Sequence, residues 1–353
     1  MSQSKKPVLG IFLGEAAGIG PELVAKVVAD GSVYEYCRPL LLGDKRVLDL
    51  GMKIAGVSFP YTVVENAKDA KWGEGLPIPI LDMKNFDPKD LKVGTIDLKS
   101  GYATGEGLVL GMDLLKSGLI DGYVFAPLNK EAFKKGGWHV EDEHYLFARE
   151  LNWLDKPRGL LNVLDDLWVF RLSGHIPFKD IPKYVTKDNL RRSIQLCYDT
   201  LRQAGIEKPV IGVAALNPHA GDGGTCGMEE IEVITPVINE FKERGIHVVG
   251  PVSADTIFIH AFNKEYNGVV TLYHDQGQIA TKIKAFDIGV TAGGGLPFGI
   301  TTPEHGTAFD IAGKGIAKTQ AMKNAIRTCA QMAMTTMKKR EAAQCSEGCC
   351  CRK

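Results

Sequence analysis

The sequence has no excess of charge of either sign: its 353 residues include 42 Lys and Arg and 42 Asp and Glu. Proteins dedicated to nucleic acids usually carry a basic face with surplus Lys and Arg, so the balance argues against a nucleic-acid partner. Long apolar runs are lacking too, because no window approaches the roughly 18 uncharged apolar residues of a membrane-spanning helix. We therefore expect neither nucleic acid nor a membrane as a partner.

Paired cysteine motifs are also missing. Four cysteines are scattered along the chain, and four crowd into the tail: Cys37, Cys197, Cys226 and Cys329, then Cys345, Cys349, Cys350 and Cys351. Scattered thiols are typical of the reducing cytoplasm, where we expect this protein. The tail lacks CxxC pairs separated by a structured loop, so we expect residues 341–353 to form a flexible Cys-rich tail rather than a metal site.

Short apolar runs alternate with longer amphipathic segments. The runs predicted to be strands are 8–13, 39–42, 123–126, 167–172, 209–215, 247–249 and 268–273. One predicted helix starts at Gly20, and four others cover 107–117, 188–204, 229–244 and 316–339. This alternation is typical of an α/β protein with a largely parallel sheet, and the length suits two domains of about 150 residues each.

Three histidines come directly after predicted strands. His175 follows 167–172, His219 follows 209–215, and His274 follows 268–273. The carboxyl ends of parallel strands form the ligand crevice of an open sheet, so three imidazoles there can gather on one divalent metal ion. The alternative is three unrelated loop histidines that hydrogen-bond to backbone. Their common position at strand ends favours the metal site.

Charged residues near the same strand ends are further candidates. Asp275, beside the third histidine, either orients an imidazole or acts as another ligand. Asp255 serves the metal or caps the helix that follows it. Lys130 and Lys282 lie near strand ends, where a lysine can hold a carboxylate or phosphate or relay a proton.

Two glycine-containing segments are candidate cofactor loops. The first runs from Pro303 to Gly315; its candidate cofactor-binding residues are His305, Gly306, Thr307, Ala308 and Asp310. We expect it to lead into a helix whose amino end favours anions. The second is the close-approach loop Gly293, Gly294 and Gly295; a plain turn is the alternative for both. A GxGxxG after a strand is missing, so a nicotinamide cofactor would bind by another fold.

At these residues the sequence resembles the 4-hydroxythreonine-4-phosphate dehydrogenase family, over about residues 8–330. The matching stretches are GEAAGIGPE at 14–22, LNPHAG at 216–221, GPVSADT at 250–256, YHDQG at 273–277, GLPF at 295–298 and HGTA at 305–308. The resemblance implies an α/β, isocitrate/isopropylmalate-dehydrogenase-like fold with two α/β domains and a central cleft. We expect residues 1–125 with 290–340 to form the domain with the cofactor loop, and 126–289 to carry the metal ligands and dimer contacts.

The resemblance also implies an activity. NAD or NADP accepts a hydride from the secondary alcohol of a small-molecule substrate, and the resulting 3-oxo acid loses carbon dioxide. One divalent metal is bound by His175, His219 and His274, with ligands drawn from both subunits of a homodimer. Zinc, magnesium, manganese and cobalt are all candidates, and an all-imidazole ligand set favours zinc or another transition metal. Lys130 and Lys282 match the family's positions for substrate and proton handling.

The sequence departs from the family at substrate-binding positions. Counting from Lys130 without gaps, the family's His-Thr pair falls on Glu143-His144, and its Asn and Arg fall on Thr291 and Ile300. Loss of the Arg removes a bidentate anion contact, and Glu143 adds negative charge. A shift of one residue would return His144 to the place of the family's His. We expect the chemistry to be kept and the substrate changed, for example to a four-carbon sugar-acid phosphate or a cis-dihydrodiol carboxylate.

Two other classes of function stay open. A metallohydrolase or lyase could use three histidines and an activated water, but it would need no adenosine loop. The segment His305–Gly315, which resembles the adenosine-binding loop of isopropylmalate dehydrogenases, weighs against that class. A non-catalytic relative would bind metal and cofactor without turnover.

Overall fold

The computed structural model describes residues 6–285 and 287–350. They divide into two compact units, one made of the chain up to Asp155 with the chain from Leu296 on, the other of Lys156–Gly295. The segment 126–155, which the sequence assigned to the second domain, lies in the first unit. The reason is that its helices α5 (Lys130–Lys135) and α6 (Glu143–Glu150) pack on α4 (Leu98–Lys116).

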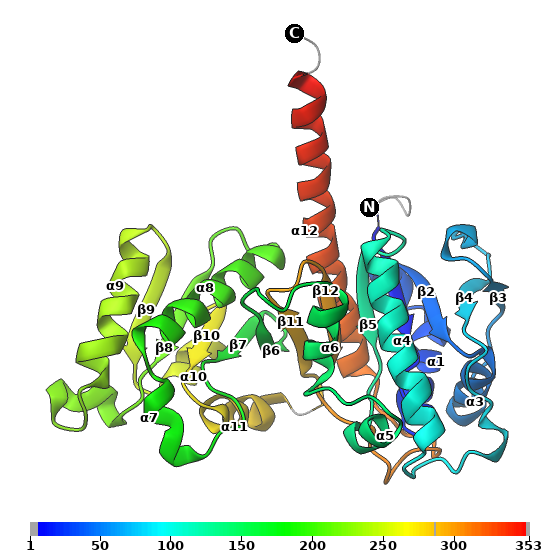
Figure 1. Ribbon diagram of the computed structural model, residues 1–353, viewed down its shortest axis with the longest axis horizontal. Helices are drawn as coiled ribbons and strands as arrows, with labels where there is room; N and C mark the ends of the chain where they lie inside the picture. Colours follow the sequence, from blue (N-terminus) through cyan, green and yellow to red (C-terminus); the bar gives the residue numbers. More distant parts are fainter. Residues whose placement is uncertain (1–5, 286, 351–353) are drawn as a thin grey trace. The chain divides into compact units, whose positions relative to one another are not determined.

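The first unit contains a parallel sheet. Its strands lie in the order β3 (Tyr61–Val64), β4 (Ile78–Asp82), β2 (Arg38–Gly43), β1 (Val8–Phe12), β5 (Gly122–Phe125) and β12 (Gly299–Pro303). Every residue of β1 is buried, as a central strand with helices on both faces requires. The remaining helices are α1 (Gly20–Ala29), α2 (Val33–Tyr36), α3 (Lys45–Ala55) and α12 (Gln320–Cys350), with 3₁₀ turns at Ala67–Asp69 and Pro88–Asp90 (Figure 1).

The second unit has a mixed sheet. Its strands lie in the order β11 (Val290–Gly294), β6 (Gly159–Leu164), β7 (Leu167–Arg171), β10 (Gly268–Thr271), β8 (Val210–Ala214) and β9 (His247–Val252). Strand β6 is antiparallel to both neighbours, whereas β7, β10, β8 and β9 are parallel. The helices are α7 (Ile181–Tyr184), α8 (Lys187–Gln203), α9 (Thr235–Glu243), α10 (Ile257–Phe262) and α11 (His274–Ala285). Short 3₁₀ segments cover Phe178–Asp180 and Pro218–Gly224, and a π-helical turn covers Glu230–Ile234.

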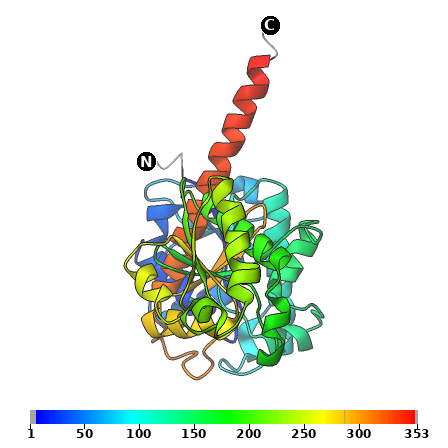
Figure 2. The ribbon, with the colours of Figure 1, turned by 90° about the vertical axis from the view of Figure 1, so that its left-hand side faces the viewer.

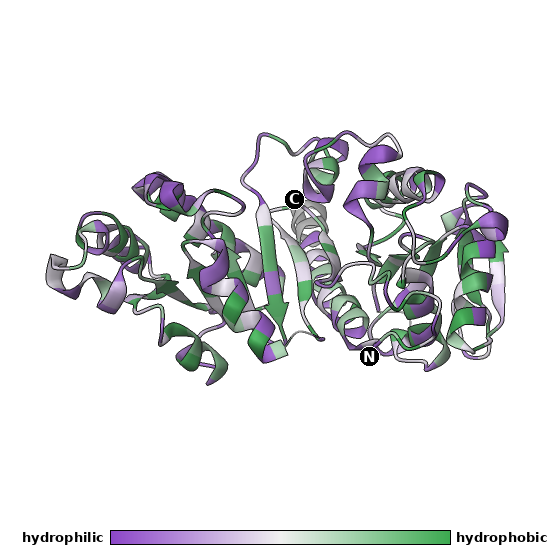
Figure 3. Ribbon diagram, turned by 90° about the horizontal axis from the view of Figure 1, so that it is seen from below, coloured by the Kyte–Doolittle hydropathy of each residue, from purple (hydrophilic) through white to green (hydrophobic). Residues whose placement is uncertain are grey.

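The predicted fold class of two α/β domains is confirmed. In Figure 3 the strands are mainly in hydrophobic colours, while many helices carry both hydrophobic and hydrophilic residues. Strands β3, β4, β6, β11 and β12 were not predicted. Helix α4 starts at Leu98 rather than Gly107, because the Asp97 side chain accepts the N–H of Ser100 and caps the helix.

The C-terminal helix is longer than expected. Its backbone is helical to Cys350, and its last turns extend away from the rest of the first unit (Figures 1 and 2), whereas we expected a flexible tail from residue 341. Alanine, glutamate, glutamine, lysine and arginine dominate residues 338–344, and all five favour helix. Residues 351–353 lie outside the described part. Among the described helices, none is both long enough and apolar enough to span a bilayer.

Candidate active site

Two of the three predicted metal-binding histidines lie together in the second unit. Strands β7 and β10 are parallel neighbours, so the residues that follow them reach the same edge of the sheet. His175 lies after β7, and His274 opens α11 after β10; their ring centroids are 5.2 Å apart at an interplanar angle of 43°. Asp275 Oδ1 lies 2.7 Å from His274 Nδ1, which holds the ring and leaves Nε2 for a metal.

His219 lies outside this pair. It is exposed in the segment after β8, which is the neighbour of β10 on its other side. In the described part of the chain, no three His, Cys, Asp or Glu side chains form a group that could hold a metal ion. Within the described residues, the chain therefore brings two imidazoles close together and leaves His219 apart from them.

The backbone around His219 adopts an unusual conformation. Five consecutive residues from His219 to Gly223 have left-handed φ/ψ values, starting with φ 52° and ψ 34° at His219. Only glycine enters this region freely, and each other residue costs about 1–2 kcal/mol. Three of the five are not glycine: His219, Ala220 and Asp222. Because strain of this kind persists only where neighbouring structure enforces it, this loop must be anchored.

The anchor is Glu230, which the sequence did not single out. Its side chain is 2% exposed, and Oε1 accepts the backbone N–H groups of Leu216 and Asn217, both at 2.8 Å. Oε2 accepts the side-chain amide of Asn217 at 2.9 Å. Burial opposes ionisation, but these donors outweigh it and hold the pKa of Glu230 below its ordinary value. Glu230 opens the π-helical turn, a feature that hydrophobic periodicity does not reveal.

The other predicted residues of the second unit lie as follows. Asp255 is exposed before α10, whose N-cap is Thr256, so Asp255 does not cap that helix. Lys282 is exposed on α11, and Thr291 is half-buried in β11.

The predicted glycine loop at 293–295 is instead largely strand. Gly293 and Gly294 belong to β11 and pair with β6. A Cβ on Gly294 would lie 2.3 Å from Leu161 Cδ1, and one on Gly295 would lie 2.3 Å from the Pro157 carbonyl oxygen. Packing within the chain therefore requires glycine at positions 294 and 295, so these two glycines give no evidence of a cofactor.

In the first unit, the loop predicted to bind cofactor packs on the loop after β1. The Thr307 carbonyl accepts the N–H of Ile19 at 3.1 Å, and a Cβ on Gly18 would lie 2.8 Å from Thr307 Cβ. Ala308 adopts a left-handed φ of 43°, while Gly306 and Asp310 are exposed. The expected helix does not follow directly, because residues 309–313 form turns and α12 begins only at Gln320.

The remaining candidates of the first unit lie on α5, α6 and β12. Lys130 is exposed at the start of α5, which the Asn129 side chain caps by accepting the N–H groups of Glu131 and Ala132. Glu143 opens α6, and His144 is buried one residue later. Ile300, which we predicted at the family's Arg position, is 2% exposed and belongs to the hydrophobic core.

Glu15, in the stretch GEAAGIGPE at 14–22, was not among the predicted site residues. It is 1% exposed, and its Oε2 accepts the Asn129 N–H at 2.6 Å. Burial raises its pKa to about 7; the Asn129 N–H opposes that rise and Asp97 adds to it. The sequence signal was a single acidic residue among small and apolar ones after a buried strand.

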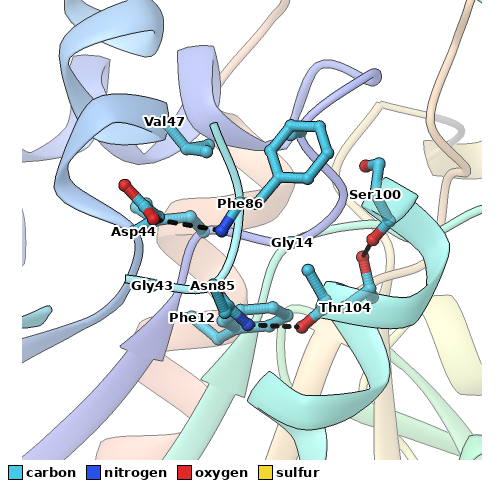
Figure 4. Close-up of a pocket in the computed structure, with 12 residues that line it drawn as sticks. Phe12, Gly14, Gly43, Asp44, Val47, Asn85, Phe86, Ser100 and Thr104 are labelled. Atoms are coloured by element: carbon cyan, nitrogen blue, oxygen red, sulfur yellow. Dashed lines mark hydrogen bonds between the residues drawn. The ribbon is translucent and has the colours of Figure 1, made fainter. Parts of the chain in front are cut away.

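A pocket opens beside the same loop (Figure 4). It has an empty volume of about 280 Å³ and lies at the carboxyl ends of β1 and β2, next to α4. Twelve residues line it: Phe12, Leu13, Gly14, Ala16, Gly43, Asp44, Val47, Asn85, Phe86, Ser100, Ala103 and Thr104. The buried Ser100 hydroxyl, on this lining, has no hydrogen-bond partner among the described residues.

Comparison with known proteins places these features in a family. The family model "Pyridoxal phosphate biosynthetic protein PdxA" matches residues 35–329. A Rhizobium meliloti protein described as "Putative 4-hydroxythreonine-4-phosphate dehydrogenase 2" is 39% identical over 94% of this chain and 95% of its own. A Clostridium botulinum protein described as "Putative D-threonate 4-phosphate dehydrogenase" is 35% identical over 92% and 96%.

Solved structures agree. A 4-hydroxythreonine-4-phosphate dehydrogenase from Burkholderia phymatum superimposes with a TM-score of 0.79 at 38% identity, covering 93% of this chain and 98% of that one. A terephthalate 1,2-cis-dihydrodiol dehydrogenase from Burkholderia xenovorans, at 23% identity and a TM-score of 0.65, shares the fold.

Proposed function

The chain belongs to the PdxA family of pyridoxal phosphate biosynthetic proteins, and from that membership we propose that it is a metal-dependent, NAD(P)-linked dehydrogenase. Its substrate would be a phosphorylated hydroxy acid whose secondary alcohol is oxidised and whose 3-oxo product loses carbon dioxide. The relatives' names as dehydrogenases favour this class over a metallohydrolase, a lyase or a non-catalytic binding protein.

The observation that carries the proposal is the pair His175 and His274. Their rings lie 5.2 Å apart, and Asp275 holds His274 through Nδ1, which suits two nitrogen ligands of one divalent cation. His219, on the neighbouring strand's loop, would be the third ligand, supplied by the partner subunit. When bound, a divalent metal polarises an alcohol oxygen and stabilises negative charge on it.

The chain's own lysines would bind substrate and move protons. Lys282 is exposed on α11, the helix that His274 opens, and Lys130 is exposed at the start of α5. An exposed ammonium group on a flexible stem can hold a carboxylate or phosphate. The exposed acids would serve the metal site, Asp275 by orienting His274 and Asp255 as a further group near the metal.

The loop His305–Asp310 is our proposed cofactor segment. Its small residues would let the backbone approach a ligand closely, and the Thr307 carbonyl holds the segment on the loop after β1 by accepting the Ile19 N–H. Backbone N–H groups flanked by small side chains are suited to donate hydrogen bonds to a nucleotide. The assay described below distinguishes NAD from NADP as the cofactor.

Two phosphorylated substrates are candidates. 4-Hydroxythreonine 4-phosphate is the substrate named for several relatives, and D-threonate 4-phosphate, a four-carbon sugar-acid phosphate, is named for others. Counting from Lys130 without gaps puts Glu143, Thr291 and the buried Ile300 at the family's His, Asn and Arg positions, which favours a substrate other than 4-hydroxythreonine 4-phosphate. Cis-dihydrodiol carboxylates remain an alternative substrate of the same chemistry.

We further propose a homodimer in the cytoplasm. Near the histidine pair, large apolar side chains are strongly exposed: Phe178 at 76%, Ile279 at 60% and Ile283 at 83%. A second copy would cover such side chains and bring its own loop to the site. The free thiols of Cys37, Cys197, Cys226 and Cys329 suit a reducing compartment.

The test is an absorbance assay of reduced nicotinamide formation. Purified protein is incubated with NAD or NADP, each divalent metal in turn, and a series of hydroxy acids with and without phosphate. We expect turnover on a phosphorylated four-carbon hydroxy acid, its loss with a chelator, and its recovery when metal is restored. No turnover on any hydroxy acid, or full turnover in the presence of chelator, would contradict the proposal.

A further inference from the structure

Glu15 lies at the point in the parallel sheet of the first unit where the order of strands reverses, between β1 and β5. Strands β2, β4 and β3 lie on one side of β1, and the strands β5 and β12, which come later in the chain, lie on its other side. In open α/β sheets, ligands bind outside the carboxyl ends of the two strands that flank such a switch point. Glu15 follows β1, and Asn129 and Lys130 follow β5. The two loops that flank the switch point therefore carry Glu15 and Lys130.

Glu15 ties these two loops together. Its backbone N–H donates to the Pro127 carbonyl at 3.2 Å, and its Oε2 accepts the N–H of Asn129 at 2.6 Å. Asn129 is in turn the N-cap of α5, whose first residue is Lys130. The loops also approach closely, because a Cβ on Gly14 would lie 2.7 Å from the Ala126 carbonyl oxygen. The carboxyl group thus sets the position of the residue before Lys130.

A purely structural tie would be better made by a neutral group. Glu15 is 1% exposed, and in the described structure its Oε1 has no hydrogen-bond partner. A buried, half-satisfied carboxyl group costs stability, whereas a glutamine would keep the acceptor without a charge. Such costs are typical of functional sites.

The same loop also contacts the proposed cofactor segment. Ile19 donates its backbone N–H to the Thr307 carbonyl, and Gly18 packs against Thr307. The segment from Gly14 to Ile19 therefore lies between the Lys130 loop and the Thr307 loop. A displacement of Glu15 would therefore shift both the Lys130 loop and the Thr307 loop.

We propose that Glu15 is a positioning residue of the active site, which holds the start of α5 through the Asn129 N–H so that Lys130 is correctly placed. This inference rests on the proposed function of Lys130. Because burial brings the pKa of Glu15 to about 7, its bond to Asn129 becomes charge-assisted, and therefore stronger, as the pH rises through neutrality. The titratable groups on the surrounding segments are Asp97 before α4, Lys130 and Glu131 on α5, Glu22 on α1, and His305 and Asp310 in the cofactor segment.

The experiment compares Glu15→Ala and Glu15→Gln with the full-length wild type. Hydrogen exchange of the peptide spanning 127–133 is measured from pH 6 to pH 8 as protection factors, and kcat and KM are measured on the best substrate found. Glu22→Gln is the matched control: Glu22 is also 1% exposed with an unpartnered Oε2, but it bonds Lys26 and the Ala317 N–H. Circular dichroism verifies that each variant is folded.

We expect Glu15→Ala to lose protection at 127–133 at every pH and to lower kcat by roughly 10–100-fold, as for a misplaced catalytic group. Glu15→Gln should keep kcat within about threefold of wild type, because its amide oxygen still accepts the Asn129 N–H. Its protection should no longer rise between pH 6 and pH 8 as that of the wild type does. Glu22→Gln should keep the wild-type pH dependence.

Three results would overturn the role of Glu15: unchanged exchange in Glu15→Ala, a kcat in Glu15→Gln as low as in Glu15→Ala, or a rise in protection with pH that persists in Glu15→Gln. The exchange measurement needs no turnover. If no substrate is found but the exchange results are as expected, the proposed dehydrogenase activity fails while the tie between the loops stands. If turnover is found but the exchange results are not as expected, the positioning role of Glu15 is refuted while the proposed dehydrogenase activity stands.

Discussion

Replacing Glu230 with alanine is expected to release the loop that carries His219. The carboxylate accepts the N–H groups of Leu216 and Asn217, both at 2.8 Å. A fully buried N–H left without an acceptor costs roughly 1–3 kcal/mol, so these two part-buried groups together cost at most about 2–6 kcal/mol. The left-handed residues His219, Ala220 and Asp222 store about 3–6 kcal/mol at 1–2 kcal/mol each. Because the anchor and the strain are of similar size, losing the anchor should let the loop relax.

Hydrogen exchange read by mass spectrometry measures this directly. In Glu230→Ala, peptides covering 216–226 should lose protection while β10 and α8 keep theirs, and the affinity for a divalent metal should fall with the displacement of His219. Glu229→Ala is the matched control, because among the described residues the Glu229 side chain accepts a hydrogen bond from the Asn217 side chain alone, at 2.7 Å. If the loop in Glu230→Ala stayed as protected as in the wild type, Glu230 would not be its anchor.

Three further predictions concern other parts of the chain. Asp275→Ala should weaken divalent-metal binding by roughly 10–100-fold in titration calorimetry, because His274 loses the group that orients it; unchanged affinity would exclude that role. The contribution of Asp44 and Glu230 to the free energy of unfolding should be constant at neutral pH and be lost on acidification below the ordinary carboxyl pKa values of 3.8 and 4.5, because hydrogen bonds outweigh burial and lower the pKa of both groups; urea titrations at acidic pH of wild type and Asp44→Asn would show the loss shrinking in the variant. Gly111→Ala should destabilise by roughly 1–3 kcal/mol in the same assay, because its Cβ would lie 2.4 Å from the buried Tyr123 ring; a stabilised variant would mean that the ring moves freely.

The sequence predicted best the elements with strong local signals. Buried strands such as β1 and β8 are short apolar runs, and α8 has the amphipathic pattern of a helix with one buried face. The missed strands lack that signal: β11 contains Gly293 and Gly294, and β12 contains threonine and proline. Their pairing partners are distant in sequence, so only the tertiary fold makes them strands.

The candidate site divides in the same way. That His175 and His274 each follow a strand could be inferred from the order of apolar runs and turns, whereas the pairing of those two strands is known only from the fold. The left-handed run at His219 could not, because its conformation depends on Glu230, reached through a side chain eleven residues away. Glu15 was not predicted for a related reason. Its proposed role depends on its burial and on its contact with Asn129, and neither can be inferred from the spacing of residues in the sequence.

The π-helical turn at Glu230–Ile234 makes this part of the chain intolerant of length changes. Such a turn accommodates one more residue than regular α-helical winding, and deleting one residue between Glu229 and Thr235 would restore the regular ladder. The shortened helix would gain in regularity but rotate its amino-terminal end by about 100° per residue relative to α9. Glu230 would then turn away from Leu216, so natural variation in this segment should consist of substitutions, with insertions and deletions confined to the exposed turns beyond α9.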